Sequence, residues 1–182
     1  MTGMAQKFVQ LITGTGMRKT ALAALVSLGM LSLNALAEND AYNGFSVGYV
    51  RSTQNSVHNS TSVFSIMRSV RLREHYGYEM QFGLFGKSGP YTSGGFVDLS
   101  AIGLLPLGDK GLKLYGRAGL VDVYVQGPLG SANNLGLTYG AGFEYPRENG
   151  LVRVGLQHFN VGNSTLSPSL SANLFSLTLL LQ

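Results

Sequence analysis

The sequence predicts an all-β fold, an eight-stranded antiparallel up-and-down transmembrane β-barrel. Three observations lead to this fold class. Apolar residues alternate with small or polar residues through most of the chain, which is the period of a β-strand with two different faces. Longer polar connections alternate with tight ones, as expected when loops and turns lie at opposite rims of a barrel. The less apolar face is mainly glycine, serine and threonine, which fit the interior of a narrow barrel.

The first element is an N-terminal export signal. From Met17 the sequence has a charged start at Arg18 and Lys19, an apolar stretch over residues 21–33 and a small-x-small cleavage site at residues 35–37. These are the three parts of a secretory signal peptide. The apolar stretch is shorter than the roughly 20 residues that a helix needs to cross a bilayer. We therefore expect cleavage of the segment and not its retention as an anchor.

Cleavage after Ala37 defines two regions. Residues 1–37 are predicted to be the signal peptide with a start assigned too early, the true start being Met17, and residues 38–182 to be the outer-membrane barrel domain. The chain carries a formal charge of +4. The leader contains three basic residues, Lys7, Arg18 and Lys19, and no acidic one. Its removal leaves ten basic and nine acidic side chains. A nearly neutral domain gives no reason to expect a nucleic-acid partner.

Eight strands are expected in the barrel domain. The alternation is clearest over residues 135–145, where leucines and aromatic residues alternate with Gly, Thr and Glu. A helical period would scatter these two sets over all sides. In chain order, the expected strands cover residues 44–52, 62–72, 77–86, 95–105, 112–125, 135–145, 151–159 and 169–181.

The connections between these strands fall into two classes that alternate along the chain. The longer, polar connections cover residues 53–61, 87–94, 126–134 and 160–168. The tight ones cover residues 73–76, 106–111 and 146–150. This order predicts a meander with long loops at one rim and short turns at the other.

Periodicity alone does not tell which face points inward, so two barrel classes are compared. A soluble lipocalin-like barrel would enclose its apolar face and expose a polar one. Here the weaker face has few charges and would coat a soluble protein poorly. As the lining of a narrow membrane barrel it is suitable, with the apolar face toward lipid and Phe45, Tyr78 and Tyr145 in an aromatic girdle near the turns. The membrane barrel is therefore the favoured interpretation.

Arg68 does not fit this pattern. It alternates with Phe64, Ile66 and Val70, which would place it on the lipid face at a cost of roughly 2 to 4 kcal/mol. A bulge in the second strand would turn Arg68 inward, and this is the preferred explanation. The facing of the second strand stays open at this point.

Two stretches resemble a known family. They read LSAIGLLPLGDKGLKLYGRAGL, beginning at Leu99, and LTYGAGFEYPRENGLVRVGLQHF, beginning at Leu137. They resemble the membrane-barrel domain shared by outer-membrane protein A-like and small surface-antigen proteins. The resemblance covers most of the barrel domain and implies the fold and an outer-membrane location more than an activity.

A lumenal ion-pair network is the candidate site. Charges in a barrel interior persist only when they are paired or wet. Strand pairing counted from the tight turns places Arg71 beside Glu79 and Arg117 opposite Glu144. Six charged residues are expected to form the network: Arg71, Glu79, Asp98, Arg117, Glu144 and Arg153. It is interpreted as a salt-bridged plug, and the alternative is a gate in which exchange of partners opens an ion path.

Enzymatic function is disfavoured. Lipid A deacylases have a His-x-Ser motif on a late strand and an acid further on. The corresponding stretch here is His158-Phe159-Asn160, with asparagine where serine is required, and residues 167–173 offer no carboxylate. We therefore expect no catalytic residue.

Metal and cofactor sites are not expected either. The chain has no cysteine, which excludes thiolate metal sites and disulfides. Its three histidines, His58, His75 and His158, share no spacing typical of metal ligands.

The predicted function is that of an outer-membrane barrel with a structural or adhesion-like role and a largely plugged lumen. A narrow gated pore is the second hypothesis, and a lipid A-modifying enzyme is the third. The expected partners are outer-membrane lipid, lipopolysaccharide and the barrel-assembly machinery. An extracellular ligand would bind at the outer loops, where Lys87 is the single formal charge, so strong capture of polyanions is not expected.

Overall fold

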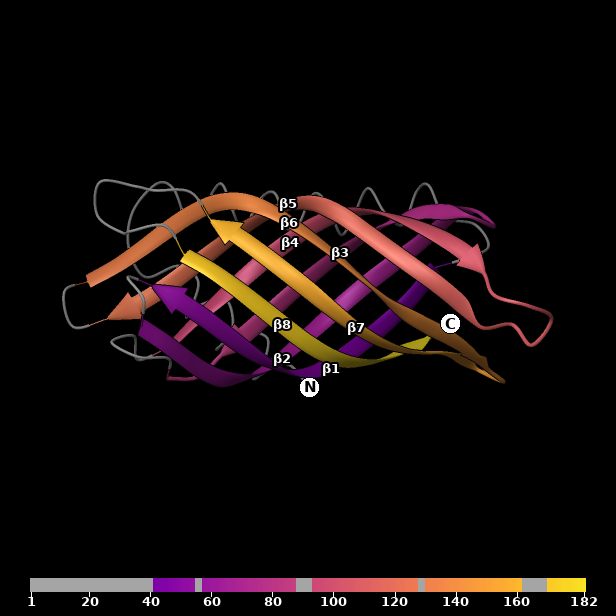
Figure 1. The fold of residues 1–182 in the computed structure, drawn as a ribbon, viewed down its shortest axis with the longest axis horizontal. Helices are drawn as coiled ribbons and strands as arrows, with labels where there is room; N and C mark the ends of the chain where they lie inside the picture. The colour runs from indigo at the N-terminus through magenta and orange to yellow at the C-terminus, as the bar shows by residue number, and fades with distance from the viewer. Residues whose placement is uncertain (1–40, 55–56, 88–92, 128–129, 162–169) are drawn as a thin grey trace, which may run out of the picture. The chain divides into compact units, whose positions relative to one another are not determined.

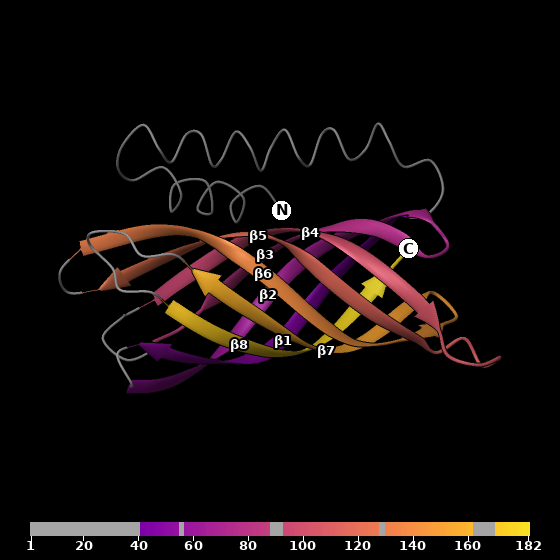
Figure 2. The same cartoon turned by 45° about the horizontal axis from the view of Figure 1, so that its top comes forward.

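Eight strands form a closed antiparallel barrel in the computed structural model, which describes residues 41–54, 57–87, 93–127, 130–161 and 170–182. Each strand pairs with its neighbour in the sequence, and β8 pairs with β1 to close the ring (Figures 1 and 2). The strands are β1 (Ala41–Gln54), β2 (Val57–Arg73), β3 (Tyr76–Phe85), β4 (Ser93–Pro106), β5 (Lys113–Gly127), β6 (Gly130–Arg147), β7 (Gly150–Val161) and β8 (Leu170–Leu181). The predicted fold class is confirmed. The predicted signal peptide lies outside the described residues.

Two hairpins are longer than the sequence suggested. Thr53 pairs with His58 in the β1–β2 ladder, and Gly127 pairs with Gly130 in the β5–β6 ladder. Residues 53–61 and 126–134 were expected to be loops because they are rich in polar residues. Their described residues are strand, because the β1–β2 and β5–β6 ladders continue past the apolar region. The other two expected loops lie mainly outside the described residues.

The opposite rim has tight turns, as predicted. The β4–β5 turn is closed by the Leu107 amide, which donates to the Leu112 carbonyl oxygen at 2.8 Å. Gly108 and Gly111 have φ angles of 70° and 76°. This left-handed region is costly for residues with a Cβ, so glycine at these two positions allows the strands to reverse within a few residues.

The strong apolar face points outward. In β1, Phe45, Val47 and Tyr49 are about half exposed, whereas Ser46 between them is buried. The same exposed face continues through the other strands and includes Leu99, Leu120, Leu137, Tyr139, Phe143, Tyr145, Val154, Leu156, Phe175 and Leu177. We call this surface the apolar belt. A soluble lipocalin-like barrel would bury these side chains, so the membrane orientation of the two faces is correct.

Arg68 lies on the outer face, and the preferred prediction of an inward turn is wrong. It pairs with Asn43 in β1 and Met80 in β3 without interruption of either ladder. The register shift in β2 comes later, between Arg71 and Arg73. The Arg68 Nη1 donates to Asn43 Oδ1 at 3.4 Å, a long contact that gives the guanidinium a polar neighbour on the lipid side.

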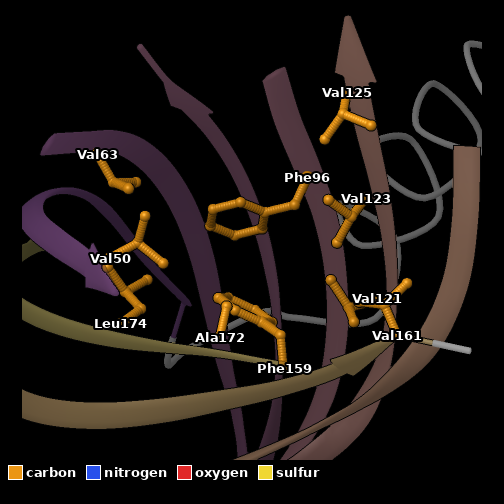
Figure 3. Packing of buried hydrophobic residues seen from close by; sticks show 10 residues of the cluster. All are labelled: Val50, Val63, Phe96, Val121, Val123, Val125, Phe159, Val161, Ala172 and Leu174. Atoms are coloured by element: carbon orange, nitrogen blue, oxygen red, sulfur yellow. The ribbon is translucent and has the colours of Figure 1, made fainter. Parts of the chain in front are cut away.

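The interior has two parts, of which the sequence predicted one. The turn-side half holds a buried group of polar and charged residues, with a few apolar residues nearer the turns. Toward the loops, the inward positions form a buried apolar cluster (Figure 3). We call it the loop-side cluster; it consists of Val50, Val63, Phe96, Val121, Val123, Val125, Phe159, Val161, Ala172 and Leu174. The predicted lining of Gly, Ser and Thr is therefore wrong for this half.

The polarity of the two faces reverses along single strands. In β5, Arg117 points inward and Leu120 outward, but further along Val121 and Val123 point inward and Asp122 outward. β7 changes in the same way: Leu156 is exposed beside buried Gln157, and outward His158 lies beside buried Phe159. On the loop side, β5 and β7 therefore have the apolar inward and polar outward residues of a water-soluble barrel.

Strand length agrees with this division. The 18 residues of β6 span about 45 Å along the barrel axis at a rise of ~3.4 Å per residue and a tilt of ~40°. The lipid-facing band of such barrels is only about 25 Å tall. The longest hairpins thus extend well past a bilayer at the loop side. Among the residues described, no helix is long and apolar enough to cross a bilayer.

Candidate functional site in the barrel interior

Six charged side chains gather in the turn-side half of the lumen. Each comes from a different strand, in order from β2 to β7: Arg71, Glu79, Asp98, Arg117, Glu144 and Arg153. All occupy inward positions of the two-residue period, and none of these side chains is more than 8% exposed. The closed barrel thus brings together residues that are far apart in the sequence.

Arg153 lies near the middle of this group. Its Nη1 donates to Glu79 Oε1 at 2.5 Å, and its Nη2 donates to Glu144 Oε2 at 2.7 Å. The same Glu144 oxygen accepts from Arg71 Nη2 at 2.5 Å. Two arginines therefore share one carboxylate, and one arginine holds two carboxylates.

Arg117 extends the network toward β4. Its Nη2 is paired with Asp98 Oδ1, and its Nη1 lies 3.6 Å from Glu79 Oε2. The contacts join the six charges into one chain of alternating sign: Arg71, Glu144, Arg153, Glu79, Arg117 and Asp98. Three positive and three negative charges balance, which reduces the cost of burying them.

Neutral polar side chains that the sequence analysis did not single out complete the network on its loop side. Gln157 Nε2 donates to Asp98 Oδ2 at 3.0 Å and to Thr138 Oγ1 at 2.9 Å. The Ser100 hydroxyl donates to Asp98 Oδ1 at 2.7 Å, and Gln81 Oε1 accepts from Arg117 Nη1 at 3.1 Å. Their signal in the sequence was their position on the inward face, at the level of the charges.

Tyr115 fills the space beside Arg153. The guanidinium carbon of Arg153 lies 4.3 Å from the centre of the Tyr115 ring, within cation–π distance. A Cβ added at Gly155 would collide with the Tyr115 hydroxyl, and one at Gly142 would also meet the ring. The two glycines thus leave room for a large aromatic side chain inside a narrow barrel.

The expected pairing within the network was partly wrong. Ser69, not Arg71, pairs with Glu79, and Arg71 instead reaches Glu144. Arg117 does not lie opposite Glu144, whose ladder partners are Lys113 and Arg153. Counting residues from a turn fails here because β2 has a register shift near Arg71 and because long side chains also meet across the lumen.

The network lies between apolar groups on both sides. The loop-side cluster begins directly beyond it, since Val121 pairs with Asp98. Toward the turns, Ile102, Leu104 and Leu180 occupy buried inward positions. Such an arrangement suits the filling of space and the neutralisation of charge.

The histidine considered for catalysis lies elsewhere. His158 is on the outer face, where its Nδ1 is 2.8 Å from Asn173 Oδ1. Its ring packs against that of Tyr139 at an interplanar angle of 37°, with centres 4.9 Å apart. Within the part of the chain that the structure describes, no group of three or more histidine and acidic residues could hold a metal ion.

Solved structures that resemble this one are small β-barrels. Neisserial surface protein A is 13% identical with a TM-score of 0.65, and the match covers 78% of this chain and 96% of that one. The N-terminal β-barrel domain of Pseudomonas aeruginosa OprF is 15% identical with a TM-score of 0.53, covering 77% and 98%. The Yersinia pestis attachment invasion locus protein Ail, in complex with the heparin analogue sucrose octasulfate, is 15% identical with a TM-score of 0.52, covering 79% and 99%.

At these identities the similarity shows a common barrel fold. No protein-family model matches the sequence, and no curated protein sequence matches it significantly. The fold that the sequence resemblance implied is therefore present.

Proposed function

We propose that the chain is a bacterial outer-membrane barrel with a structural or surface-interaction role and a lumen that is filled and not open. The observation that carries this proposal is the opposite polarity of the two surfaces in the turn-side half. Leucine and aromatic side chains are exposed there, while none of the six charged side chains is more than 8% exposed. Only a lipid environment outside makes that distribution favourable. Export by a signal peptide over residues 1–37 and contact with the barrel-assembly machinery belong to the same proposal.

The location is tested by fractionation and gel mobility. We expect the protein in the outer-membrane fraction, with the folded barrel migrating differently from the boiled one. N-terminal sequencing of the mature protein should begin at Glu38. Recovery as a soluble periplasmic protein without a mobility shift would refute the proposed location.

A filled lumen is supported by two contiguous groups. The alternating chain of charges occupies the turn-side half, and the loop-side cluster occupies the other. Phe96 and Phe159 are 5.0 Å apart between ring centres within that cluster, and both are nearly inaccessible to solvent. Ions would have to cross an apolar layer without hydration, which is costly.

A narrow gated pore is the second candidate, favoured by one observation. Glu144 contacts both Arg71 and Arg153, and Glu79 contacts both Arg153 and Arg117. Shared partners permit an exchange of ion pairs. Single-channel recording in planar bilayers separates the two candidates. We expect no discrete conductance from the native protein and none from Glu144→Ala; a step conductance that changes in this variant would establish the gate.

The surface-interaction role belongs to the loop-side rim, where two hairpins extend beyond the apolar belt. Rigid scaffolds commonly carry recognition at such positions. The structure of Ail with a sulfated sugar supports a test with similar polyanions. Weak binding is expected here, because Lys87 is the single formal charge of the expected loops. We propose no enzymatic activity; hydrolysis of lipid A that is lost in His158→Ala would contradict this.

A further inference from the structure

Polar side chains form a row across four adjacent strands on the outer face. Tyr139 of β6 pairs with His158 of β7, which pairs with Asn173 of β8, which pairs with Arg51 of β1. Direct Cα partners in antiparallel strands point to the same side of the sheet. The four side chains therefore face outward together, and we call them the outer polar row.

His158, Asn173 and Arg51 border the apolar belt, to which Tyr139 itself belongs. Two residues nearer the turns, the next outward positions on the same four strands are Ala141, Leu156, Phe175 and Tyr49. Leu156, Phe175 and Tyr49 are each more than half exposed. Beyond the row, the next outward positions on β7, β8 and β1 are polar, namely Asn160, Ser171 and Thr53, whereas that on β6 is the exposed Leu137. The part of the row on β7, β8 and β1 thus lies where lipid acyl chains give way to head groups.

Contacts within the row fix the imidazole. His158 Nδ1 is 2.8 Å from Asn173 Oδ1, and its ring packs against the tilted ring of Tyr139. The oxygen of Asn173 is an acceptor, so Nδ1 is the donor of this contact. These contacts hold the ring beside Asn173, whose NH₂ group is left to donate to a group outside the barrel.

Arg51 supplies a charge at this position. Its side chain is exposed, and the described part of the chain has no carboxylate within ion-pair distance of it. Strand spacing places it about 5 Å from Asn173 and about 10 Å from His158, measured between backbones. Flexible side chains of this length can converge on one group above Asn173.

The opposite side of the barrel has the opposite charge. Asp122 on β5 faces outward, since it pairs with Leu135, which is 67% exposed. In a closed ring of eight strands, β5 lies across from β1. The loop-side exterior is therefore cationic around Arg51 and anionic around Asp122, which directs an anion to the outer polar row.

We propose that the outer polar row binds a phosphate group of lipid A, the phosphorylated glycolipid of the outer leaflet. The Arg51 guanidinium donates two hydrogen bonds to the phosphate oxygens, and the side-chain NH₂ of Asn173 is a neighbouring donor. The acyl chains lie along Leu156, Phe175 and Tyr49. This inference rests on the proposed outer-membrane location, in which the loop-side rim faces the cell exterior.

Native mass spectrometry of the purified, detergent-folded barrel tests the site. The probes are diphosphorylated lipid A, its dephosphorylated form, and phosphatidylglycerol as a phosphate from another source. We expect diphosphorylated lipid A to bind most tightly. Arg51→Ala should weaken this binding about tenfold, Arg51→Lys should weaken it less, and Asn173→Ala should have a smaller effect than Arg51→Ala. The matched control is Lys87→Ala, which removes an exposed cation outside the row and should change nothing.

The outcomes are distinguishable. Equal binding of phosphatidylglycerol, or equal losses in Arg51→Ala and Lys87→Ala, would mean general attraction of anions and would overturn the site. Unchanged affinity in Arg51→Ala, with the folded mobility on gels retained, would overturn it as well. Fractionation of cells tests the location independently, so failure of the lipid site would leave the outer-membrane proposal intact.

Discussion

Replacement of Glu79 by glutamine tests whether the lumenal charges are balanced as a unit. Glu79 is fully buried and joins Arg153 at 2.5 Å to Arg117 at 3.6 Å. Glutamine has nearly the same shape but no charge, so the three arginines of the network would face only Asp98 and Glu144. Loss of one partner from a buried pair costs about 3 to 5 kcal/mol, and we expect Glu79→Gln to lower the free energy of unfolding by this amount.

A second substitution should reverse much of this loss. Arg153→Met in the Glu79→Gln background removes the unbalanced charge and leaves two intact pairs, Arg71 with Glu144 and Arg117 with Asp98. We expect the double variant to be more stable than Glu79→Gln alone. Glu148→Gln in an exposed turn is the control and should change the unfolding free energy by less than about 0.5 kcal/mol.

Urea unfolding of the barrel in lipid vesicles measures these differences, followed by circular dichroism and by the fraction that keeps the folded gel mobility. A loss below about 1 kcal/mol in Glu79→Gln would refute the reasoning, because it would mean that water or ions screen the lumenal charges. A double variant less stable than the single one would also refute it.

Three other substitutions examine different features by the same unfolding assay. Phe96→Ala should lower the unfolding free energy by about 3 to 5 kcal/mol, because it opens a cavity in the loop-side cluster; an unchanged midpoint would indicate that this interior is wet. Gly155→Ala should destabilise the barrel, because the new Cβ collides with the Tyr115 hydroxyl, and Tyr115→Phe in the same chain should restore part of the loss. Arg68→Leu should stabilise the barrel by about 2 to 4 kcal/mol, and destabilisation would show that the outward arginine has a favourable partner.

Much of the fold could be predicted because the period of two is a local property. One face of β1 can be identified from Phe45, Val47 and Tyr49 alone, without knowledge of any other strand. The orientation of that face followed from the chemistry of the opposite one, which is too poor in charge to coat a soluble protein. Arg68 was misjudged because its cost on the lipid face was considered without Asn43, its neighbour in β1.

The rest depended on how strands are offset from one another. The inward position of Arg71 was predictable, but its contact with Glu144 depends on a register shift in β2 and on the diameter of the lumen. The apolar half of the interior was not predicted, because the apolar residues move from the outward to the inward positions partway along the strands. At Leu120 and Val121 two apolar residues follow each other, and this break in the alternation marks where the lipid-facing set ends and the inward set begins.

Because polarity reverses along β5 and β7, the outward positions of one strand differ in the substitutions that they tolerate. Lysine at Leu120 would be destabilising because this residue faces lipid, and lysine at Val121 would be destabilising because this residue faces the apolar interior. At Asp122, two positions from Leu120 and on the same side of the strand, a lysine would be accepted. If every strand residue is replaced by lysine in turn, the outward positions that tolerate lysine should lie beyond the bilayer. The first tolerant outward position on each strand should therefore mark the edge of the bilayer on that strand.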